Sequence, residues 1–488
     1  MSTLRHVVVL GGGPAGLATA HELTAGGTRV TVLEREGHVG GLARTIHHKG
    51  YKFDLGGHRW FTKNEDLNDW FRRLMDGHLV MVDRISRIYH EGKYYNYPIS
   101  IGDLVKNVSP LTIAQIGASF AWASLRQAAG GRPVVTMQQA YTAQFGTKLY
   151  EMFFRRYSEK VWGAPCTELS ADWVSQRSRG LSVATLAREA LLGSRKDVVS
   201  LVEQFMYPRD GYMRISERMA EDIAAAGNDV LLGARVTGVA YRGPADFEVA
   251  YIRDGEARTI QADAVVSTIP LGVLARILSP ACGPEVEAAA RGLVFRDLIT
   301  ANVMLRRRRV SPDTWLYIQD SDILFGRMHE PKNWSPAMVP DDEHTSLVLE
   351  CFCSRGDHIW SMTDEEIGRR CVADLVDKLG FIKAAEVEDI QIVRTRDAYP
   401  VYDLDYTRKT QTIQRHLRRH GGLHTVGRGG TFRYNNADHS IEMGLLLGRE
   451  MQGEEVDHMA VNTDRAYQEV KRAGEQGGHY RRRSVQVD

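Results

Sequence analysis

Residues 6–16 read His6-Val7-Val8-Val9-Leu10-Gly11-Gly12-Gly13-Pro14-Ala15-Gly16, and this stretch decides the fold. Its β-branched run, His6–Leu10, predicts a buried parallel strand. The apolar periodicity that follows predicts a helix from about Ala15 to Ala25, which a pair of glycines ends. Arg29–Leu33 predicts the next strand, and Glu34 closes it. The chain therefore begins with a βαβ unit.

The glycines of this unit have separate roles in binding a dinucleotide. Gly11 permits the tight turn, Gly13 lets the backbone approach a pyrophosphate, and Gly16 lets the helix pack closely on the strand. The helix N-terminus offers free N–H groups to the pyrophosphate. Glu34 can accept hydrogen bonds from the ribose hydroxyls. Strand, glycines, helix and acid occur together, which predicts dinucleotide binding.

The composition is that of a globular enzyme with two or three domains in 488 residues. With 62 basic and 61 acidic residues, the net charge gives no reason to expect nucleic acid or a membrane as partner. The five cysteines form no CxxC pairs, so we expect reduced thiols and no metal site. No secretory signal and no apolar segment long enough to span a bilayer are visible, which predicts a cytoplasmic location.

A second glycine pair distinguishes FAD from NAD. The segment Gly40-Gly41-Leu42-Ala43-Arg44-Thr45 resembles the loop of amine-oxidase-like flavoproteins that runs under the FAD ribityl and diphosphate. A basic side chain in a glycine loop suits a phosphate-rich cofactor. FAD is therefore the expected cofactor.

Later motifs resemble the UDP-galactopyranose mutase family, within the wider amine oxidase and protoporphyrinogen oxidase superfamily. They occur in the family's order: Asp54–Thr62, Leu149–Gly163, Thr167–Ser170 with Arg177, Tyr207–Tyr212, Phe325–Arg327, Tyr399–Val401 and Gly427–Tyr434. The resemblance implies an α/β fold with a Rossmann-like FAD-binding domain, a helical insert and an antiparallel-sheet substrate domain.

The activity implied by the resemblance is pyranose–furanose isomerisation of a nucleotide sugar, with reduced FAD as the nucleophile. Its substrate-binding positions are Phe153, Tyr157, Trp162, Arg177, Arg327, Tyr399, Arg428 and Tyr434. Guanidinium forks match the oxygens of a diphosphate leaving group. The family places the Tyr157 ring on the nucleobase. Phe153, four residues earlier on the same helix face, is equally well explained as a core aromatic.

His58, Arg327 and Arg428 are the candidate catalytic residues, with His58 acting beside the flavin but not as a general base. Ser440 is a candidate N-cap for the apolar helix Ile441–Met451. The resemblance implies that the N-terminus of this helix faces the flavin. The full set of expected cofactor-binding residues is Gly11, Gly13, Gly16, Glu34, Arg35, Gly41, Leu42, Arg44, Gly57, His58, Val236, Gly427, Arg428, Asp438, His439 and Ser440.

The domains are expected to interleave along the chain. The FAD-binding domain is predicted at residues 1–93, 206–271 and 421–462, the helical insert at 97–205, and the antiparallel-sheet domain at 272–420. The basic, glycine-containing tail at 472–488 is expected to be disordered.

A true oxidoreductase, which passes hydride from its substrate to FAD, is the alternative function. The segment Ser267-Thr268-Ile269-Pro270 resembles the oxidase branch more than the mutases. The set of three arginines favours the mutase and thus a nucleotide sugar as the small-molecule partner. A homodimer is a candidate assembly.

Overall fold

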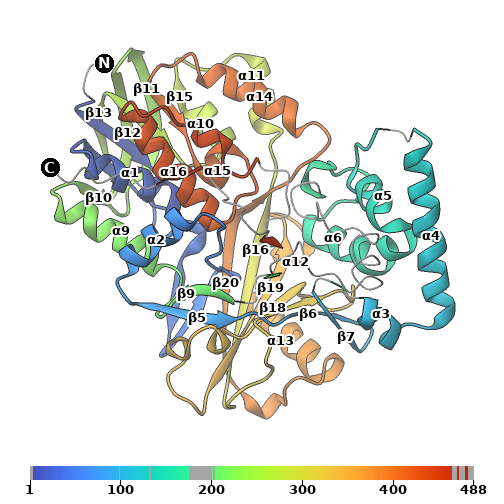
Figure 1. Cartoon of the computed structure of the whole chain (residues 1–488). Helices are drawn as coiled ribbons and strands as arrows, with labels where there is room; N and C mark the ends of the chain where they lie inside the picture. The colour runs from blue at the N-terminus through green and yellow to red at the C-terminus, as the bar shows by residue number, and fades with distance from the viewer. Residues whose placement is uncertain are drawn as a thin grey trace.

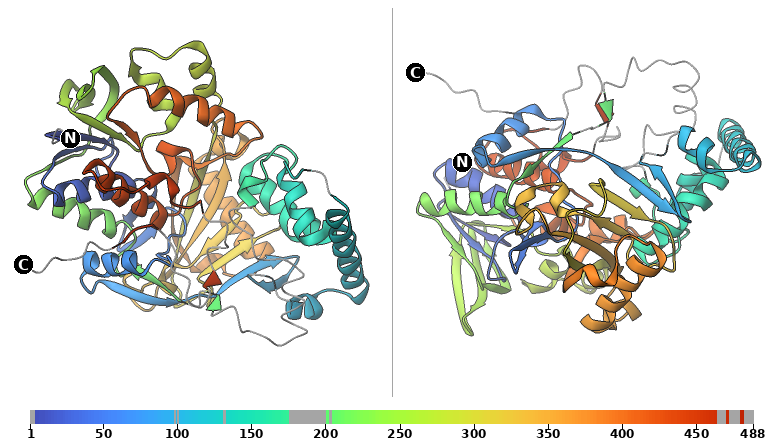
Figure 2. Two further views of the ribbon diagram at one scale, coloured as in Figure 1. Left: turned by 45° about the horizontal axis from the view of Figure 1, so that its top comes forward. Right: turned by 90° about the horizontal axis from the view of Figure 1, so that it is seen from below.

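The computed structural model describes residues 4–97, 99, 101–130, 133–174, 200–201, 204–463, 470–471 and 479–481. The nucleotide-binding half lies at one side of the molecule, a large mixed sheet occupies the middle, and a group of helices stands at the other side (Figure 1). Figure 2 shows the same order from two further directions. The prediction of an α/β fold with these three parts is confirmed.

The nucleotide-binding half is built on a five-stranded parallel sheet in the order β10-β2-β1-β14-β21. Its strands are β1 (His6–Leu10), β2 (Arg29–Leu33), β10 (Asp229–Leu231), β14 (Ala264–Ser267) and β21 (Leu423–Thr425). Helices α1 (Pro14–Ala25), α9 (Arg214–Ala225) and α16 (Ala437–Met451) pack together beside this sheet. The predicted βαβ unit is therefore present.

Both faces of this sheet are buried, which explains the unbroken apolar runs in its strands. Val7 and Val9 belong to the core shared with α1 and α16, whereas Val8 and Leu10 belong to a second core. A four-stranded sheet in the order β13-β12-β11-β15 supplies much of that second core. Its strands are β11 (Arg235–Gly243), β12 (Asp246–Arg253), β13 (Glu256–Ala262) and β15 (Leu278–Ser279).

The central sheet has seven strands in the order β20-β16-β19-β18-β17-β6-β7, and only the β17–β6 pair is parallel. They are β6 (Ser86–His90), β7 (Lys93–Asn96), β16 (Phe295–Leu305), β17 (Trp315–Ile318), β18 (Arg327–His329), β19 (Thr345–Cys353) and β20 (Val387–Pro400). Helices α12 (His358–Ser361) and α13 (Asp364–Ala373), with the π-helical turn Asp374–Lys378, follow β19. Cys351 and Cys353 are both buried in this sheet's core, because residues two apart in a strand point to the same face.

The helical insert stands beyond the sheet. It comprises α3 (Ile101–Asn107), α4 (Pro110–Ala128), α5 (Met137–Leu149), a π-helical turn (Tyr150–Phe154) and α6 (Arg155–Trp162). The smaller elements are β3 (Thr45–His48), β4 (Tyr51–Asp54), α2 (Glu65–Met75), β5 (Leu79–Asp83), β8 (Ser200–Leu201), β9 (Gln204–Pro208), β22 (Val470–Lys471) and α15 (Gly427–Thr431), with 3₁₀ turns at Gly41–Ala43, Pro331–Asn333, Pro336–Met338, Ala384–Glu386 and His458–Ala460.

Three segments pack elsewhere than their expected domain. Strands β6 and β7 join the central sheet, so the first nucleotide-binding segment ends before Ser86 and not at residue 93. Helices α10 (Leu271–Ile277), α11 (Pro284–Arg291) and α14 (Tyr406–Leu417) contribute to the second core of the nucleotide-binding half, although they fall at 272–420 for the most part.

The expected disorder from residue 472 is wrong for residues 479–481. Tyr480 is buried, and its backbone N–H donates to Glu442 Oε1 at 2.9 Å. Asn64 Nδ2 donates to the carbonyl oxygen of Tyr480 at 2.8 Å, and the Arg449 guanidinium lies 4.2 Å from the centre of the Tyr480 ring. This short segment therefore joins α2 to α16.

Candidate active site

The glycine loop between β1 and α1 is shaped by close contacts at two of its glycines. Gly11 has a φ of 106°, and a Cβ there would lie 2.1 Å from Thr268 Oγ1. A Cβ at Gly16 would lie 2.2 Å from the carbonyl oxygen of Gly11. At Gly13 the nearest atom among the described residues would be 3.9 Å away. The loop thus leaves open space at Gly13, next to the N-terminal N–H groups of α1, where a pyrophosphate fits.

Glu34 lies at the end of β2 and faces this loop. Its Oε2 accepts a hydrogen bond from the Gly12 N–H at 2.7 Å, and its Oε1 accepts one from the Glu36 N–H at 2.9 Å. Each carboxylate oxygen retains a further lone pair for a ribose hydroxyl. Arg35 is exposed and pairs with Glu36. Val236, on β11, is half-buried and packs against the second core.

The second glycine loop contacts the first. The Gly40 N–H donates to the carbonyl oxygen of Gly12 at 2.9 Å, and a Cβ at Gly41 would lie 3.2 Å from Gly13 Cα. Burial lowers the pKa of the Arg44 guanidinium, and its Nε has no hydrogen-bond partner among the described residues. A buried, unpaired donor is costly unless a bound group accepts from it. The glycine cradle and Arg44 therefore fit the diphosphate of a dinucleotide. Leu42 is half-buried between this loop and the insert core.

The Gly57–His58 loop lies between the dinucleotide loops and the central sheet. The Gly57 N–H donates to Glu350 Oε1 at 3.3 Å, and a Cβ at Gly57 would lie 2.5 Å from the Trp315 ring. His58 Nδ1 lies 3.1 Å from the Gly56 carbonyl oxygen, which requires that nitrogen to carry the proton. Burial and the charge of Arg428 lower the pKa of His58 to about 4. The ring is therefore neutral at physiological pH and is a weak base.

The start of α16 differs from the expected one. The helix begins at Ala437 and Asn436 is its N-cap, so the prediction that Ser440 caps it is wrong. The Asn436 N–H donates to His439 Nδ1 at 3.2 Å, and Ser440 Oγ donates to the Asn436 carbonyl oxygen at 3.0 Å. Burial raises the pKa of Asp438. Because the helix begins at Ala437, the side chains of Asp438, His439 and Ser440 lie in its first turn.

Arg327 and Glu350 form a buried ion pair on neighbouring strands β18 and β19. Arg327 Nη2 lies 2.9 Å from Glu350 Oε2 and donates to the Tyr399 hydroxyl at 2.9 Å. The Glu350 side chain is fully buried, and Arg327 Nε has no hydrogen-bond partner among the described residues. One guanidinium donor is therefore available to a ligand while the charge is held in place by a carboxylate.

Arg428 joins the nucleotide-binding half to β20. Its Nε and Nη2 donate to the Asn435 carbonyl oxygen at 2.9 and 2.6 Å, and its Nη1 donates to the Ala398 carbonyl oxygen at 2.9 Å. Its guanidinium carbon lies 5.2 Å from the ring centres of both Tyr399 and Tyr434, which stack at 5.7 Å. Three of its nitrogen atoms thus donate hydrogen bonds to backbone carbonyl oxygens, and its positive charge lies close to the rings of Tyr399 and Tyr434. Gly427 packs its Cα against α1.

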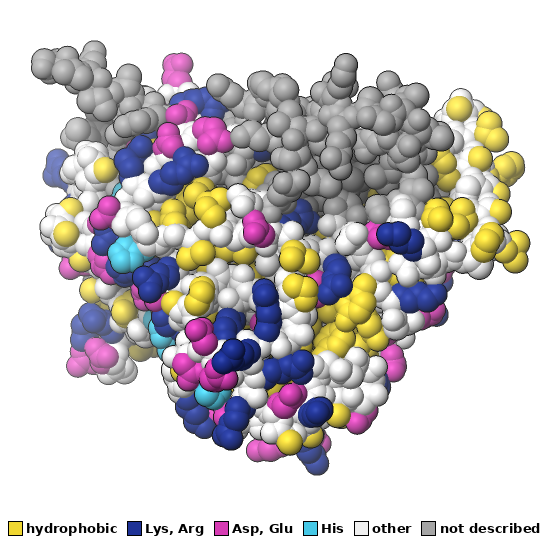
Figure 3. Space-filling model, turned by 60° about the horizontal axis from the view of Figure 1, so that its bottom comes forward, with side chains coloured by type: hydrophobic (Ala, Val, Ile, Leu, Met, Phe, Trp, Pro, Cys, Tyr) yellow, Lys and Arg dark blue, Asp and Glu magenta, His cyan; other side chains and the backbone are white. Residues whose placement is uncertain are grey.

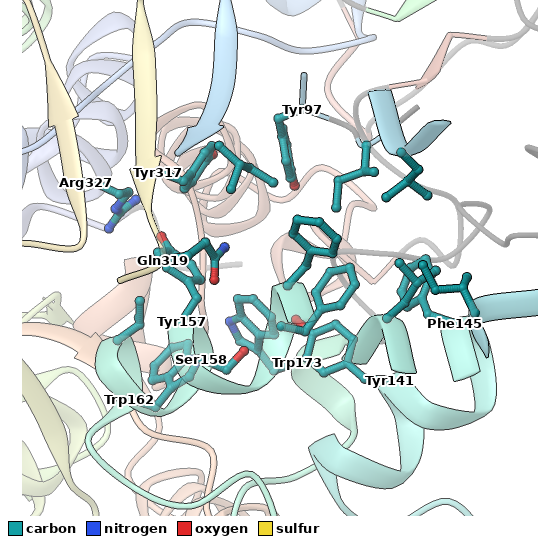
Figure 4. A pocket seen from close by; sticks show the side chains of 18 of the residues that line it. Tyr97, Tyr141, Phe145, Tyr157, Ser158, Trp162, Trp173, Tyr317, Gln319 and Arg327 are labelled. Atoms are coloured by element: carbon teal, nitrogen blue, oxygen red, sulfur yellow. The ribbon is translucent and has the colours of Figure 1, made fainter. Parts of the chain in front are cut away.

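The aromatic residues of the insert form one wall of a cavity of about 300 Å³. Figure 4 shows Tyr157, Trp162 and Tyr317 near the Arg327 end of this cavity and Phe145 at the opposite end. Phe153 and Tyr157 both line it, although Phe153 belongs to the π-helical turn and Tyr157 to α6. Phe153 also packs edge-on against Tyr95 at 4.9 Å, so it is a core residue as well. Trp162 lies edge-on to Tyr434 at 5.9 Å.

Seven of the eight predicted substrate positions therefore converge on one cavity and its Arg327 end. Arg177 lies outside the described residues. Glu350 and Tyr317 were not predicted. Glu350 is the single charged residue in the strand Thr345–Cys353, and a lone acid in an apolar strand is a signal for a buried ion pair. Tyr317 carries no comparable signal, because an aromatic residue in a strand is common.

His329, next to this cluster, makes stability depend on pH. Burial and the nearby His58 and Arg327 lower the pKa of His329 to about 3 in the folded protein, against about 6.5 when unfolded. The unfolded chain therefore takes up a proton that the folded chain excludes. The contribution of the neutral His329 to the free energy of unfolding is fully present above pH 6.5 and is lost as the pH falls toward 3. We expect Tm to fall less steeply below pH 6.5 in His329→Phe, which retains the ring stacked on Trp334 at 4.8 Å.

Thermal unfolding followed by circular dichroism between pH 7.5 and 4.5 measures this slope. The control is the same change at His47, which is exposed on β3 and should leave the slope as it is. If Tm fell as steeply with pH in His329→Phe as in the native protein, the pH dependence would not come from His329.

Comparisons with known proteins agree with a flavoprotein fold. The family model "Flavin containing amine oxidoreductase" matches residues 14–432. The phytoene dehydrogenase of Streptomyces griseus is 28% identical over 300 residues, 56% of each protein. The L-amino acid oxidase Cdc18 of Crotalus durissus cumanensis is 40% identical over 72 residues, only 15% of this chain and 14% of the oxidase. This chain thus matches a small part of that oxidase.

Among solved structures, reduced UDP-galactopyranose mutase superposes with a TM-score of 0.80 at 20% identity, covering 94% of this chain and 98% of that one. A putative protoporphyrinogen oxidase from Exiguobacterium sp. 255-15 superposes with a TM-score of 0.70 at 18% identity, covering 93% and 99%. At these identities the superpositions show the shared fold. Fold and family model together indicate a flavin-dependent enzyme with FAD as cofactor.

Proposed function

Because this chain belongs to the family of flavin-containing amine oxidoreductases, we propose that it is an FAD-dependent mutase converting a nucleotide sugar between pyranose and furanose forms. One observation carries the proposal: Arg327 and Arg428 lie with Tyr399 and Tyr434 next to the Gly57–His58 loop. With Glu350 paired to Arg327, the two guanidinium groups leave one net positive charge at this place, for which an oxidase of neutral amines or alcohols has no need. A sugar diphosphate does need it, because its leaving group carries negative charge.

The residues of this cluster have complementary tasks. Reduced FAD, when bound, supplies the nucleophile for the anomeric carbon. Arg327 Nε is the unpaired donor for a diphosphate oxygen, and Glu350 holds the guanidinium plane in position. Burial raises the pKa of the Tyr399 hydroxyl to about 12, and it raises that of Tyr157 as well. Both phenols therefore remain protonated and able to donate. Trp162 and Phe153 exclude water from the cavity.

The redox state of the flavin distinguishes a mutase from an oxidase. We expect conversion of UDP-galactopyranose, or of another nucleotide sugar in a panel, only after the flavin has been reduced with dithionite under anaerobic conditions. The reduced spectrum should persist through many turnovers, because isomerisation transfers no net electrons. Chromatography of the sugar nucleotides and absorbance at 450 nm are the two measurements.

An oxidoreductase acting on an apolar substrate is the second candidate. The observation in its favour is the carbon-rich lining of the cavity away from Arg327, which includes Ile99, Leu104 and Ile116. Stoichiometric bleaching of oxidised flavin by an added substrate, with an oxidised product, would establish this candidate and refute the mutase.

A further inference from the structure

Helix α4 is apolar on two opposite faces. Ile113, Ile116 and Gly117 line the cavity on its inner side. On its outer side Leu111, Trp122 and Leu125 are 71%, 68% and 65% exposed. Together with the exposed Ala114 and Ala118 they form a stripe at helical spacing, which we call the α4 stripe. Figure 3 shows hydrophobic side chains gathered at the end of the molecule where Figure 1 places α4.

An exposed apolar stripe is costly in water, so it points to a partner. Within the described residues no helix is long and apolar enough to cross a bilayer. The local charge identifies its kind. Residues 104–150, between Asp103 and Glu151, contain no Asp or Glu and four basic residues, of which Lys106, Arg126 and Lys148 lie within the described structure. The balanced net charge of the chain thus conceals a cationic, acid-free segment.

A helix with large apolar side chains on one side and basic residues nearby binds in the interface of an anionic lipid layer. Trp122 suits this place because an indole combines an apolar body with a polar N–H. The basic residues near the stripe are Lys106, which lies on α3, and Arg126, which follows Leu125 on α4. A second copy of the chain offers no such match, because two acid-free segments would place like charges together.

The cavity reaches the surface beside the same stripe. Val105, on α3, lines the cavity and is 59% exposed. Gly117 also lines it and is exposed on α4. The lining of the cavity includes Ile116, Phe145 and Tyr434. Figure 4 shows Phe145 at the opposite end of the cavity from Arg327. The cavity is therefore shaped for an amphiphile whose polar group lies at Arg327 and whose apolar chain extends toward α3 and α4.

We propose that the α4 stripe docks on an anionic lipid surface and that the cavity takes up from it a molecule with a long apolar chain. The inference does not rest on the proposed function, since lipid binding and chain binding can be measured without any reaction. It bears on the substrate, because a membrane-derived amphiphile would carry its reacting group to the arginine end.

Flotation of the FAD-loaded protein with lipid vesicles tests the docking. We expect the protein to float with phosphatidylethanolamine–phosphatidylglycerol vesicles, and at least tenfold less of it to float after Trp122→Glu with Leu125→Glu. The matched control is Leu404→Glu, since Leu404 is 51% exposed outside the insert and should leave flotation unchanged. Sedimentation equilibrium is run on the same samples.

Failure of the native chain to float, or equal flotation of the double variant, would overturn the proposal. So would a dimer that the double variant converts to monomer without any effect on lipid binding, because the stripe would then be an interface between copies.

The cavity is tested with cis-parinaric acid, whose fluorescence rises in an apolar environment. We expect saturable binding by the native chain and at least a tenfold weaker Kd for Gly117→Phe. An added Cβ at Gly117 meets no atom within 4 Å among the described residues, so this variant should fold and still float with vesicles. Equal binding by the variant would overturn the cavity assignment. Mutase activity on nucleotide sugars with no chain or vesicle binding would overturn this inference alone.

Discussion

Replacement of Arg327 by Met should lower kcat/KM by a factor of about 10³ with FAD still bound, because a charge-assisted donor to the leaving group is lost. The variant should also be less stable. It leaves the fully buried carboxylate of Glu350 without its partner at 2.9 Å, and such a loss costs about 3–5 kcal/mol. Steady-state kinetics, the flavin absorbance and the urea midpoint measure the three effects.

The double change Arg327→Met with Glu350→Gln separates the two roles. A neutral amide at position 350 removes the unpaired charge, so most of the lost stability should return. Activity should not return, because the donor to the substrate is still missing. Arg306→Met, at an exposed arginine paired with Glu388, is the matched control and should change neither quantity. Recovery of activity in the double variant would show that Arg327 acts only on folding.

The strands of both large sheets could be predicted because their signals are local. His6–Leu10 and Thr345–Cys353 are continuous apolar runs, and such runs are buried on two faces wherever they lie. Which sheet a strand joins is a tertiary matter. Residues 86–96 form a hairpin of two short strands, and nothing within them indicates pairing with β17, more than 200 residues later. The domain boundary near residue 93 was therefore misplaced.

The identity of a site residue could be predicted where a sequence motif contains it. Its hydrogen-bond partners could not, because they depend on how distant segments pack. Motif position identified Arg327 and Arg428, but not that Arg428 would hold the Asn435 and Ala398 carbonyl oxygens. The predicted start of α16 was wrong because Asn436, Asp438 and Ser440 are all residue types that cap helices, and the sequence alone does not show which of the three is the N-cap. The cavity is lined by residues of α3, α4, α5 and α6 and of the central sheet, and no local pattern encodes how these elements meet.

The glycine loop permits a test of the cofactor site that is independent of substrate. Gly13 and Gly16 differ in what an added Cβ would meet. At Gly16 the Cβ would lie 2.2 Å from a backbone oxygen, so Gly16→Ala must displace α1 from β1. At Gly13 the nearest described atom is 3.9 Å away, so the protein itself tolerates the methyl group. A loss of FAD binding in Gly13→Ala can then be ascribed to contact with the cofactor.

We expect Gly13→Ala to weaken FAD binding at least 100-fold while the Tm of the apoprotein stays within about 2 °C of the native value, since only the approach of the pyrophosphate is blocked. Gly16→Ala should lose both FAD and folded protein. Gly37→Ala is the control, because Gly37 has no atom within 4 Å of an added Cβ and no positive φ. Calorimetric titration of apoprotein with FAD and thermal unfolding give both quantities. Native FAD affinity in Gly13→Ala would mean that the diphosphate lies elsewhere, since a methyl group at Gly13 would stand in the open space beside Gly13, 3.9 Å from Gly41 Cα.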